Sequence, residues 1–180
     1  ESRMDCRWGR RFGCALAGLL LTALSGCGPL VIASRPDTFA VPQDAAAQVR
    51  GGQSVALNNA YTAETQVKIF AGGVDWLADL KQYTETAMTM LGKEMQKKGI
   101  TVAPQSAKSV TLRVYDVQAS PGWVIRSSLA LEALYGDGTQ STIRAENTSP
   151  SDAWRAVDGA IMFAVTRLLR DEQFLAYVNR

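Results

Sequence analysis

The sequence predicts an α+β fold: a two-layer sandwich in which two long helices cover one face of a mainly antiparallel sheet of about five strands. Two observations predict it. Apolar and polar residues alternate in five segments between residues 54 and 147, which is the period of half-buried strands. Segments 74–98 and 150–170 instead carry apolar residues at helical spacing. This order puts both helices on one face of the sheet and leaves the other face polar.

The five strands are expected at residues 54–58, 65–70, 109–118, 123–135 and 139–147. Gly136-Asp137-Gly138 predicts a tight turn between the last two, because Asp-Gly accepts the positive φ angles of such turns. Trp123 begins the fourth strand, and the alternation places it on the inner face with Leu129 and Leu131. The fifth strand is the most polar, so we expect it at an edge of the sheet.

The first helix is expected from about Val74 to Lys98. Its apolar stripe consists of Leu77, Leu80, Thr84, Ala87, Met88, Leu91 and Met95. The second helix is expected to have Ser149 as its N-cap and Pro150 in its first turn, and to run to Arg170. A short helix is expected to follow and to pack back on the domain.

The N-terminal segment has the organisation of a secretion signal. Arg7, Arg10 and Arg11 precede an uncharged run of 13 residues, Phe12–Leu24. This run is too short to span a membrane as a helix, which takes ~20 apolar residues. A basic end followed by a short apolar run is typical of a signal peptide. Residues 1–3 precede the first methionine, Met4, and are not included in the fold prediction.

The end of this run, Leu24-Ser25-Gly26-Cys27, resembles the lipobox of bacterial lipoproteins. The resemblance implies cleavage before Cys27, attachment of diacylglycerol to its thiol and acylation of the new amino terminus. Several acyl chains on one cysteine are enough for stable anchoring, which takes at least two. Gly28 stands where many inner-membrane lipoproteins have Asp, which implies the periplasmic face of the outer membrane. An ordinary signal peptide cleaved elsewhere, or a short buried helix, is the alternative.

Composition excludes several function classes. Segment 1–26 holds four of the 19 Lys and Arg and two of the 17 Asp and Glu, which leaves 15 of each sign in residues 27–180. A neutral domain does not favour nucleic acid, which attracts clustered positive charge. The chain has no histidine, which excludes histidine-based catalysis and nearly all zinc sites. No metal or cofactor is expected beyond the covalent lipid on Cys27.

Three regions are therefore expected: a signal peptide (1–26), the lipidated cysteine with a flexible tether (27–52), and a single α/β domain (53–180). The tether is predicted from its three prolines and from the lack of a sustained period. The 154 residues after the signal are enough for one domain with its own core.

The order of elements from Ser54 to Arg180 behind a lipobox resembles small bacterial outer-membrane lipoproteins of the YajG type, whose domain is akin to the N-terminal domain of TolB. The resemblance rests on Ser54-Val55-Ala56-Leu57-Asn58, Trp76-Leu77-Ala78-Asp79-Leu80, the meander Val110–Asn147 and Asp171-Glu172-Gln173-Phe174-Leu175. It implies a two-layer sandwich with no established activity, and an accessory role in an envelope machine instead of an enzymatic one.

The first hypothesis is thus a non-enzymatic adaptor that binds another envelope protein, a glycan or a lipid carrier. Its candidate binding surface is the polar sheet face, with Arg113, Tyr115, Arg126, Glu132, Arg144 and Glu146. A solvated surface with cross-strand ion pairs, each worth under ~1 kcal/mol, is the alternative. The identity of the partner and the oligomeric state are left open.

Two further hypotheses come from other classes. A cell-wall or sugar hydrolase needs a carboxylate pair, for which Glu132 and Glu146 are the candidates. Neighbouring arginines favour their ionised forms, which does not suit a general acid. A carrier of an apolar or glycan ligand would instead use a cleft between sheet and helices lined by Trp76, Trp123 and Trp154. Aromatic residues at such spacings more often belong to a filled core.

Overall fold

The computed structural model describes residues 28–180. The signal segment and the lipobox, Cys27 included, lie outside the described residues. The elements in chain order are β1 (Leu30–Val31), β2 (Ser54–Asn59), β3 (Gln66–Phe70), β4 (Trp76–Asp79), α2 (Leu80–Lys97), β5 (Thr101–Val102), β6 (Lys108–Ser120), β7 (Ile125–Tyr135), β8 (Gln140–Ser149), α3 (Ala153–Leu168) and α4 (Glu172–Val178).

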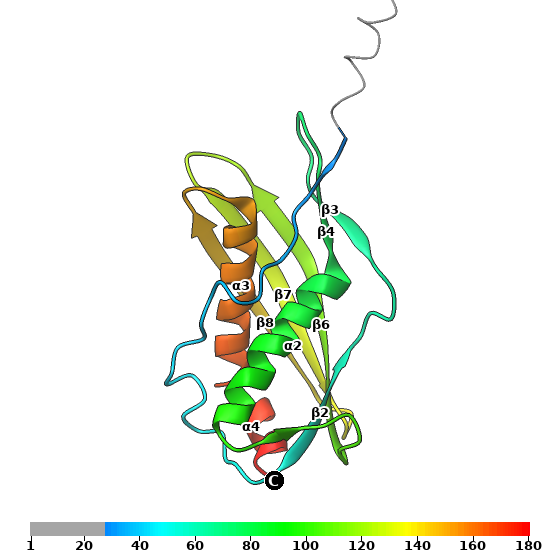
Figure 1. Ribbon diagram of the computed structural model, residues 1–180, viewed down its shortest axis with the longest axis vertical. Coiled ribbons are helices and arrows are strands. Elements are labelled where there is room, and N and C mark those ends of the chain that lie inside the picture. The colour runs from blue at the N-terminus through cyan, green and yellow to red at the C-terminus, as the bar shows by residue number, and fades with distance from the viewer. Residues whose placement is uncertain (1–27) are drawn as a thin grey trace, which may run out of the picture.

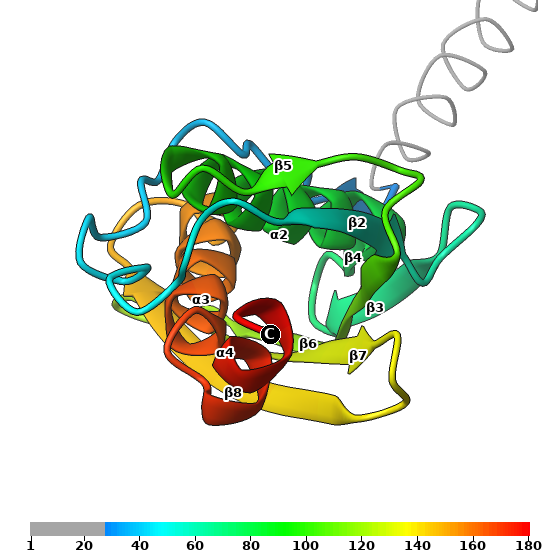
Figure 2. The ribbon, with the colours of Figure 1, turned by 90° about the horizontal axis from the view of Figure 1, so that it is seen from below.

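The predicted fold class is confirmed. A five-stranded sheet has the order β5-β2-β6-β7-β8, in which β6, β7 and β8 are antiparallel and β2 is parallel to both of its neighbours. The helices α2 and α3 pack on one face of this sheet (Figure 1). α4 and the C-terminus lie at one end of the molecule, toward the viewer in Figure 2. As predicted, the polar strand β8 is an edge of the sheet.

The core lies between the sheet and the helices, because alternate residues of the central strands point toward the helices. Val110, Leu112 and Val114 of β6 are fully buried there. The largest buried side chains of the two helices include Tyr83, Leu91, Met95, Ile161 and Leu168. Burying a side chain of this size stabilises the fold by about 1.5–3 kcal/mol. This core fills the space in which the carrier hypothesis had placed a cleft.

A second, three-stranded sheet was not predicted. β3 and β4 form a hairpin, and β1 pairs with β4 in parallel. β4 occupies residues 76–79, which we had predicted as helix because their apolar residues also fit helical spacing. Pairing with β3 makes this stretch extended. Asp79 then ends the strand and caps α2, since its carboxylate accepts hydrogen bonds from the backbone N–H groups of Lys81 and Thr65.

Two boundaries in the second half also differ. β7 begins at Ile125, so Trp123 lies in the β6–β7 loop with its side chain fully exposed (103%), and its predicted place on the inner face is wrong. Ser149 ends β8, and its hydroxyl accepts hydrogen bonds from the backbone N–H groups of Ser151 and Asp152. α3 therefore begins later than predicted, with Asp152 as N-cap.

The segment predicted as a flexible tether instead packs against the helices, so the domain includes it. Its buried apolar residues, all part of the core, are Ile32, Val41, Ala45, Ala46 and Val49. Polar contacts hold the same stretch: Asp44 pairs with Arg170 at 2.8 Å, and Asn179 donates to the carbonyl of Gln48 at 3.0 Å. The proline count was misleading here, because apolar residues between and after the prolines contact the core.

Candidate functional site

The predicted binding face comprises Arg113, Tyr115, Arg126, Glu132, Arg144 and Glu146. The register places all six on the side of the sheet opposite the helices. Arg113 lies opposite Glu132, and Arg144 lies opposite Ala130, two positions from Glu132. The other three follow at even spacings along the strands, and residues two apart share a face. The structure thus brings these six residues onto one face, and their role in binding stays a prediction.

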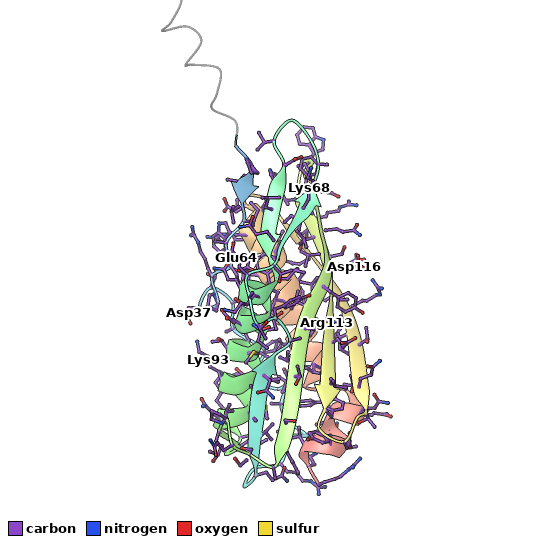
Figure 3. All side chains as sticks on the ribbon, turned by 90° about the vertical axis from the view of Figure 1, so that its right-hand side faces the viewer. Asp37, Glu64, Lys68, Lys93, Arg113 and Asp116 are labelled. Carbon is purple, nitrogen blue, oxygen red and sulfur yellow. The ribbon has the colours of Figure 1, made fainter. Side chains whose placement is uncertain are left out.

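The centre of this face is paired internally. The guanidinium of Arg113 donates to the Glu132 carboxylate at 3.0 Å and lies 4.9 Å from the centroid of the Tyr115 ring. Arg144 pairs with Asp116 at 2.8 Å. Exposed ion pairs contribute ~0.2–1 kcal/mol each. A partner at this position therefore has to compete with contacts that are already made. Figure 3 labels Arg113 and Asp116 on this side of the molecule.

Asp116 occupies a bulge that sequence reasoning missed. The register shifts between Tyr115 and Gln118, and Asp116 has φ 52°, a region that few residues with a side chain adopt. Hydrogen bonds from Arg144 and then Gln118 lower the pKa of the Asp116 carboxyl, and the same pairing raises the pKa of Arg144. The bulge thus aims a carboxylate at an arginine of the predicted face.

The two carboxylates of the hydrolase hypothesis lie far apart along the strands. Glu132 is opposite Thr142, and Glu146 is four residues beyond Thr142 on β8. Four strand residues span about 13 Å, whereas the paired carboxylates of glycosidases lie ~5–9.5 Å apart. Glu132 is also engaged by Arg113. The register therefore gives this hypothesis no support.

The described chain begins at the end of the molecule opposite the C-terminus (Figure 1). An open groove of about 320 Å³ is lined in part by its first strand, β1. Its apolar lining includes Leu30 and Val31 of β1, Trp76 of β4, Ile125 of β7 and Trp154 of α3. Its volume is at the lower end of the range for small-molecule sites. Two of the three tryptophans of the carrier hypothesis thus line a groove, whereas Trp123 is not among its lining residues.

Charged side chains hold one wall of this groove. The guanidinium of Arg35 lies 4.5 Å from the centroid of the Trp154 ring, and that of Arg155 lies 4.9 Å from it. Asp152 pairs with Arg155 at 3.4 Å. Cations over an indole ring are favourable, so these contacts fix the orientation of Trp154.

A buried polar cluster holds β1 and the following residues beside the groove. The hydroxyl of Ser34 donates to Oδ1 of Asp158 at 2.6 Å, and the backbone N–H of Arg35 donates to Oδ2 at 2.7 Å. Ser34 also contacts the hydroxyl of Thr86 at 2.7 Å. Asp158 is fully buried, and this burial raises the pKa of its carboxyl despite the hydrogen bonds. Sequence analysis missed Asp158, although a carboxylate within an apolar helical stripe was an available signal.

Residues 28–180 offer neither a metal site nor a membrane-spanning helix. No group of three or more Asp, Glu, Cys or His side chains in this range is arranged to hold a metal ion. None of its helices combines the length and hydrophobicity that crossing a membrane takes. What the candidate surfaces offer is recognition through ion pairs, aromatic rings and apolar contact.

Comparisons with known proteins add little. No protein-family model matches the sequence, and no curated protein matches it significantly. Among solved structures, it is similar to the crystal structure of protein XCC0632 from Xanthomonas campestris, described under the family model DUF330. The TM-score is 0.45 and the sequence identity 15%, over 84% of this chain and 93% of that chain. This distant likeness to a small bacterial α/β protein carries no argument about function and no support specific to the YajG type.

Proposed function

We propose that the protein is a lipoprotein of the bacterial cell envelope, held at the periplasmic face of the outer membrane by lipid on Cys27, and that it acts as a non-enzymatic accessory or adaptor subunit. The observation that carries the proposal is the basic N-terminus and short apolar run that end in Leu24-Ser25-Gly26-Cys27. Only Gly28 and Pro29 separate Cys27 from Leu30, where the folded domain begins, and the three steps along the chain span at most about 11 Å.

The adaptor role is supported by the surfaces that the domain presents. The outer sheet face offers arginines and a tyrosine, residue types that are enriched in protein interfaces. β8 adds a ten-residue edge strand, which is able to accept a strand of a partner. Glu132 and Glu146 do not form the close pair that hydrolysis needs, so we propose a binding protein and not an enzyme.

The lipid anchor is tested by the intact mass of the protein purified from bacterial membranes. We expect a mass increased by the acyl groups, on a chain that begins at Cys27. A Cys27→Ser variant with a cleavable signal should appear in the soluble periplasmic fraction. A mature chain that begins elsewhere and carries no acyl group refutes the anchor.

The adaptor role is tested by crosslinking in cells followed by affinity purification. We expect discrete envelope partners with the native protein, fewer partners with Cys27→Ser, and loss of at least one partner when all six outer-face residues are alanine. A matched control replaces the exposed α2 residues Glu85, Thr89 and Lys93 with alanine. If the six-alanine variant keeps every partner, the outer face is not the binding surface.

A second candidate function is a carrier of an apolar or glycan ligand, and the groove beside Trp154 favours it. Native mass spectrometry of the purified protein should then detect a lipid or glycan in noncovalent complex. Trp154→Ala should reduce its occupancy while the acyl groups on Cys27 remain. Protein without any copurified ligand, at the same acylation, argues for the adaptor alone.

A further inference from the structure

Exposed apolar side chains gather at one end of the domain. Within residues 28–180, seven large apolar residues are exposed, and five of them belong to three segments at the end where the described chain begins. We call this surface the β1 end, and it consists of Leu30, Val31, Val74, Trp123 and Val124. The side chain of Trp123 contacts almost nothing, since it is fully exposed. A cluster of this kind on a soluble domain usually marks a contact surface.

The three segments of the β1 end converge although they are distant in sequence. Leu30 pairs with Trp76, which follows Val74 by two residues. Val124 precedes Ile125, which lines the same groove as Leu30 and Trp76. In Figure 1 the β3–β4 turn, the β6–β7 loop and the start of the described chain all lie at the end opposite the C-terminus. The five apolar residues therefore lie at the same end of the domain.

We propose that the β1 end lies on the lipid bilayer, with Trp123 at the interface between headgroups and acyl chains. The inference rests on the proposed lipid anchor. Leu30 is the third residue after Cys27, so acyl chains on Cys27 hold Leu30 within about 11 Å of the anchored cysteine and keep the β1 end close to the membrane. Tryptophan favours this interfacial depth, because its ring is apolar and its N–H is polar.

The charges at the β1 end indicate how it meets the bilayer. Lys68 pairs with Asp75 at 2.6 Å beside Val74, and Arg155 pairs with Asp152 beside the groove. Lys68 and Arg155 are thus neutralised by carboxylates within the protein, whereas Arg35, which lines the groove, lies over the Trp154 ring and has no ion pair among the described residues. The contact is therefore mainly apolar, in contrast to a polybasic patch, and depends little on anionic lipid or on salt.

The test measures the depth of Trp123 in the acylated protein. The protein is purified from membranes and reconstituted in phosphatidylethanolamine–phosphatidylglycerol vesicles that contain brominated lipids. The mature chain has three tryptophans, so the difference between the native protein and Trp123→Ser isolates the emission of Trp123. We expect bromines near the headgroups to quench this emission, and the vesicles to shield it from aqueous iodide, with little change between 0.1 and 0.5 M salt.

A matched control moves the tryptophan to the other end. Leu134 is also exposed, at 43%, but lies beside the β7–β8 turn near α4. In the double variant Trp123→Ser, Leu134→Trp, the relocated tryptophan should stay open to iodide and unquenched by lipid. Equal quenching of the tryptophan at both ends overturns the proposed orientation.

The Cys27→Ser variant separates the inference from the proposed function. Without lipid, this variant should float weakly with the same vesicles, and Trp123→Ser should lower its partition by about tenfold, the value of one buried large side chain. Such a result supports the inference even if the intact mass shows no acylation. Acylated protein whose Trp123 stays open to iodide on vesicles overturns the inference and leaves the anchor standing. If Trp123 is shielded from iodide in native envelopes but not on lipid vesicles, the inference is also overturned, and the β1 end contacts a protein partner instead.

Discussion

Large apolar side chains are buried at one end of the domain and exposed at the other. At the α4 end, Tyr135, Phe174 and Tyr177 are buried together, with the two tyrosine rings stacked 5.0 Å apart. At the β1 end, Trp123 and Val124 project from a loop into solvent. Both ends consist of turns and chain ends, so exposure at one of them is not a general consequence of loops. The difference is the basis of the proposal that the β1 end lies on the lipid bilayer.

Hydrogen bonds explain how the α4 end closes. The hydroxyl of Tyr177 accepts from the backbone N–H groups of Ser109 and Gly136 at 2.9 and 3.2 Å. The hydroxyl of Tyr135 donates to Ser141 at 2.7 Å, and burial raises the pKa of Tyr135 to about 12. The tyrosine rings are thus buried with their hydroxyl groups hydrogen-bonded. At the β1 end, in contrast, the side chain of Trp123 is fully exposed.

The largest expected effect on stability comes from a substitution at the α4 end. Phe174→Ala should lower the free energy of unfolding by about 3–5 kcal/mol, because Phe174 is fully buried against Tyr135. Urea unfolding of the Cys27→Ser protein measures it. Phe163→Ala is the matched control, since Phe163 is 40% exposed, and it should cost under about 1 kcal/mol. Equal effects of the two substitutions contradict the contrast between buried and exposed aromatic residues.

The next largest effect is expected in the segment that follows β1, which Asp158 holds in place. Asp158→Ala removes the acceptor of the Ser34 hydroxyl and of the Arg35 N–H, and should cost about 1–3 kcal/mol. Hydrogen exchange should show faster opening of residues 30–40, while α4 keeps its protection. Uniform loss of protection in both regions means that the cluster supports the whole fold and not the β1 end in particular.

The raised pKa of Asp158 also predicts a pH dependence. Because the folded-state pKa lies above the unfolded value of about 3.9, its contribution to stability is full below the unfolded pKa and is lost as pH rises through the folded pKa. The free energy of unfolding of the native protein relative to Asp158→Asn should therefore fall between about pH 4 and the folded pKa. A difference that rises over this interval contradicts the assignment.

A smaller effect is expected on the outer face between the two ends. A double-mutant cycle of Arg113→Ala and Glu132→Ala should give a coupling of about 0.2–1 kcal/mol, because the pair is partly open to solvent, with side chains 44% and 21% exposed. The coupling should decrease in 0.5 M salt. A coupling well above this range would show that the pair is a structural element and not part of an available surface.

The smallest effect on stability is expected at the β1 end. Trp123→Ser should change the free energy of unfolding by less than about 0.5 kcal/mol, because its ring contacts almost nothing in the chain. The same variant should nevertheless show the largest change in vesicle binding. A clear loss of stability would mean that Trp123 packs against the domain and is not held free for the membrane.

Local sequence determined much of the domain. The two-residue period fixed the faces of β6, β7 and β8, because a strand with one buried face has a single register that hides its apolar residues. Gly136-Asp137-Gly138 gave the turn, and Gly138 does have positive φ at 85°. The candidate outer face followed directly, since its six residues lie on strands whose inner residues, apart from Trp123, were identified correctly.

The conformation of the β1 end and of the segments around it depended on tertiary contacts. Trp76-Leu77-Ala78-Asp79 fits the helical period and the extended one, and pairing with β3 resolved the choice. The segment expected as a tether is held by Asp158, a contact that joins residues 124 positions apart in the chain. Trp123 stayed outside because β7 begins two residues later, where its pairing with β8 ends. Periodicity describes the average environment along one segment. The conformation of each of these three regions depended instead on which distant segment of the chain packs or pairs with it.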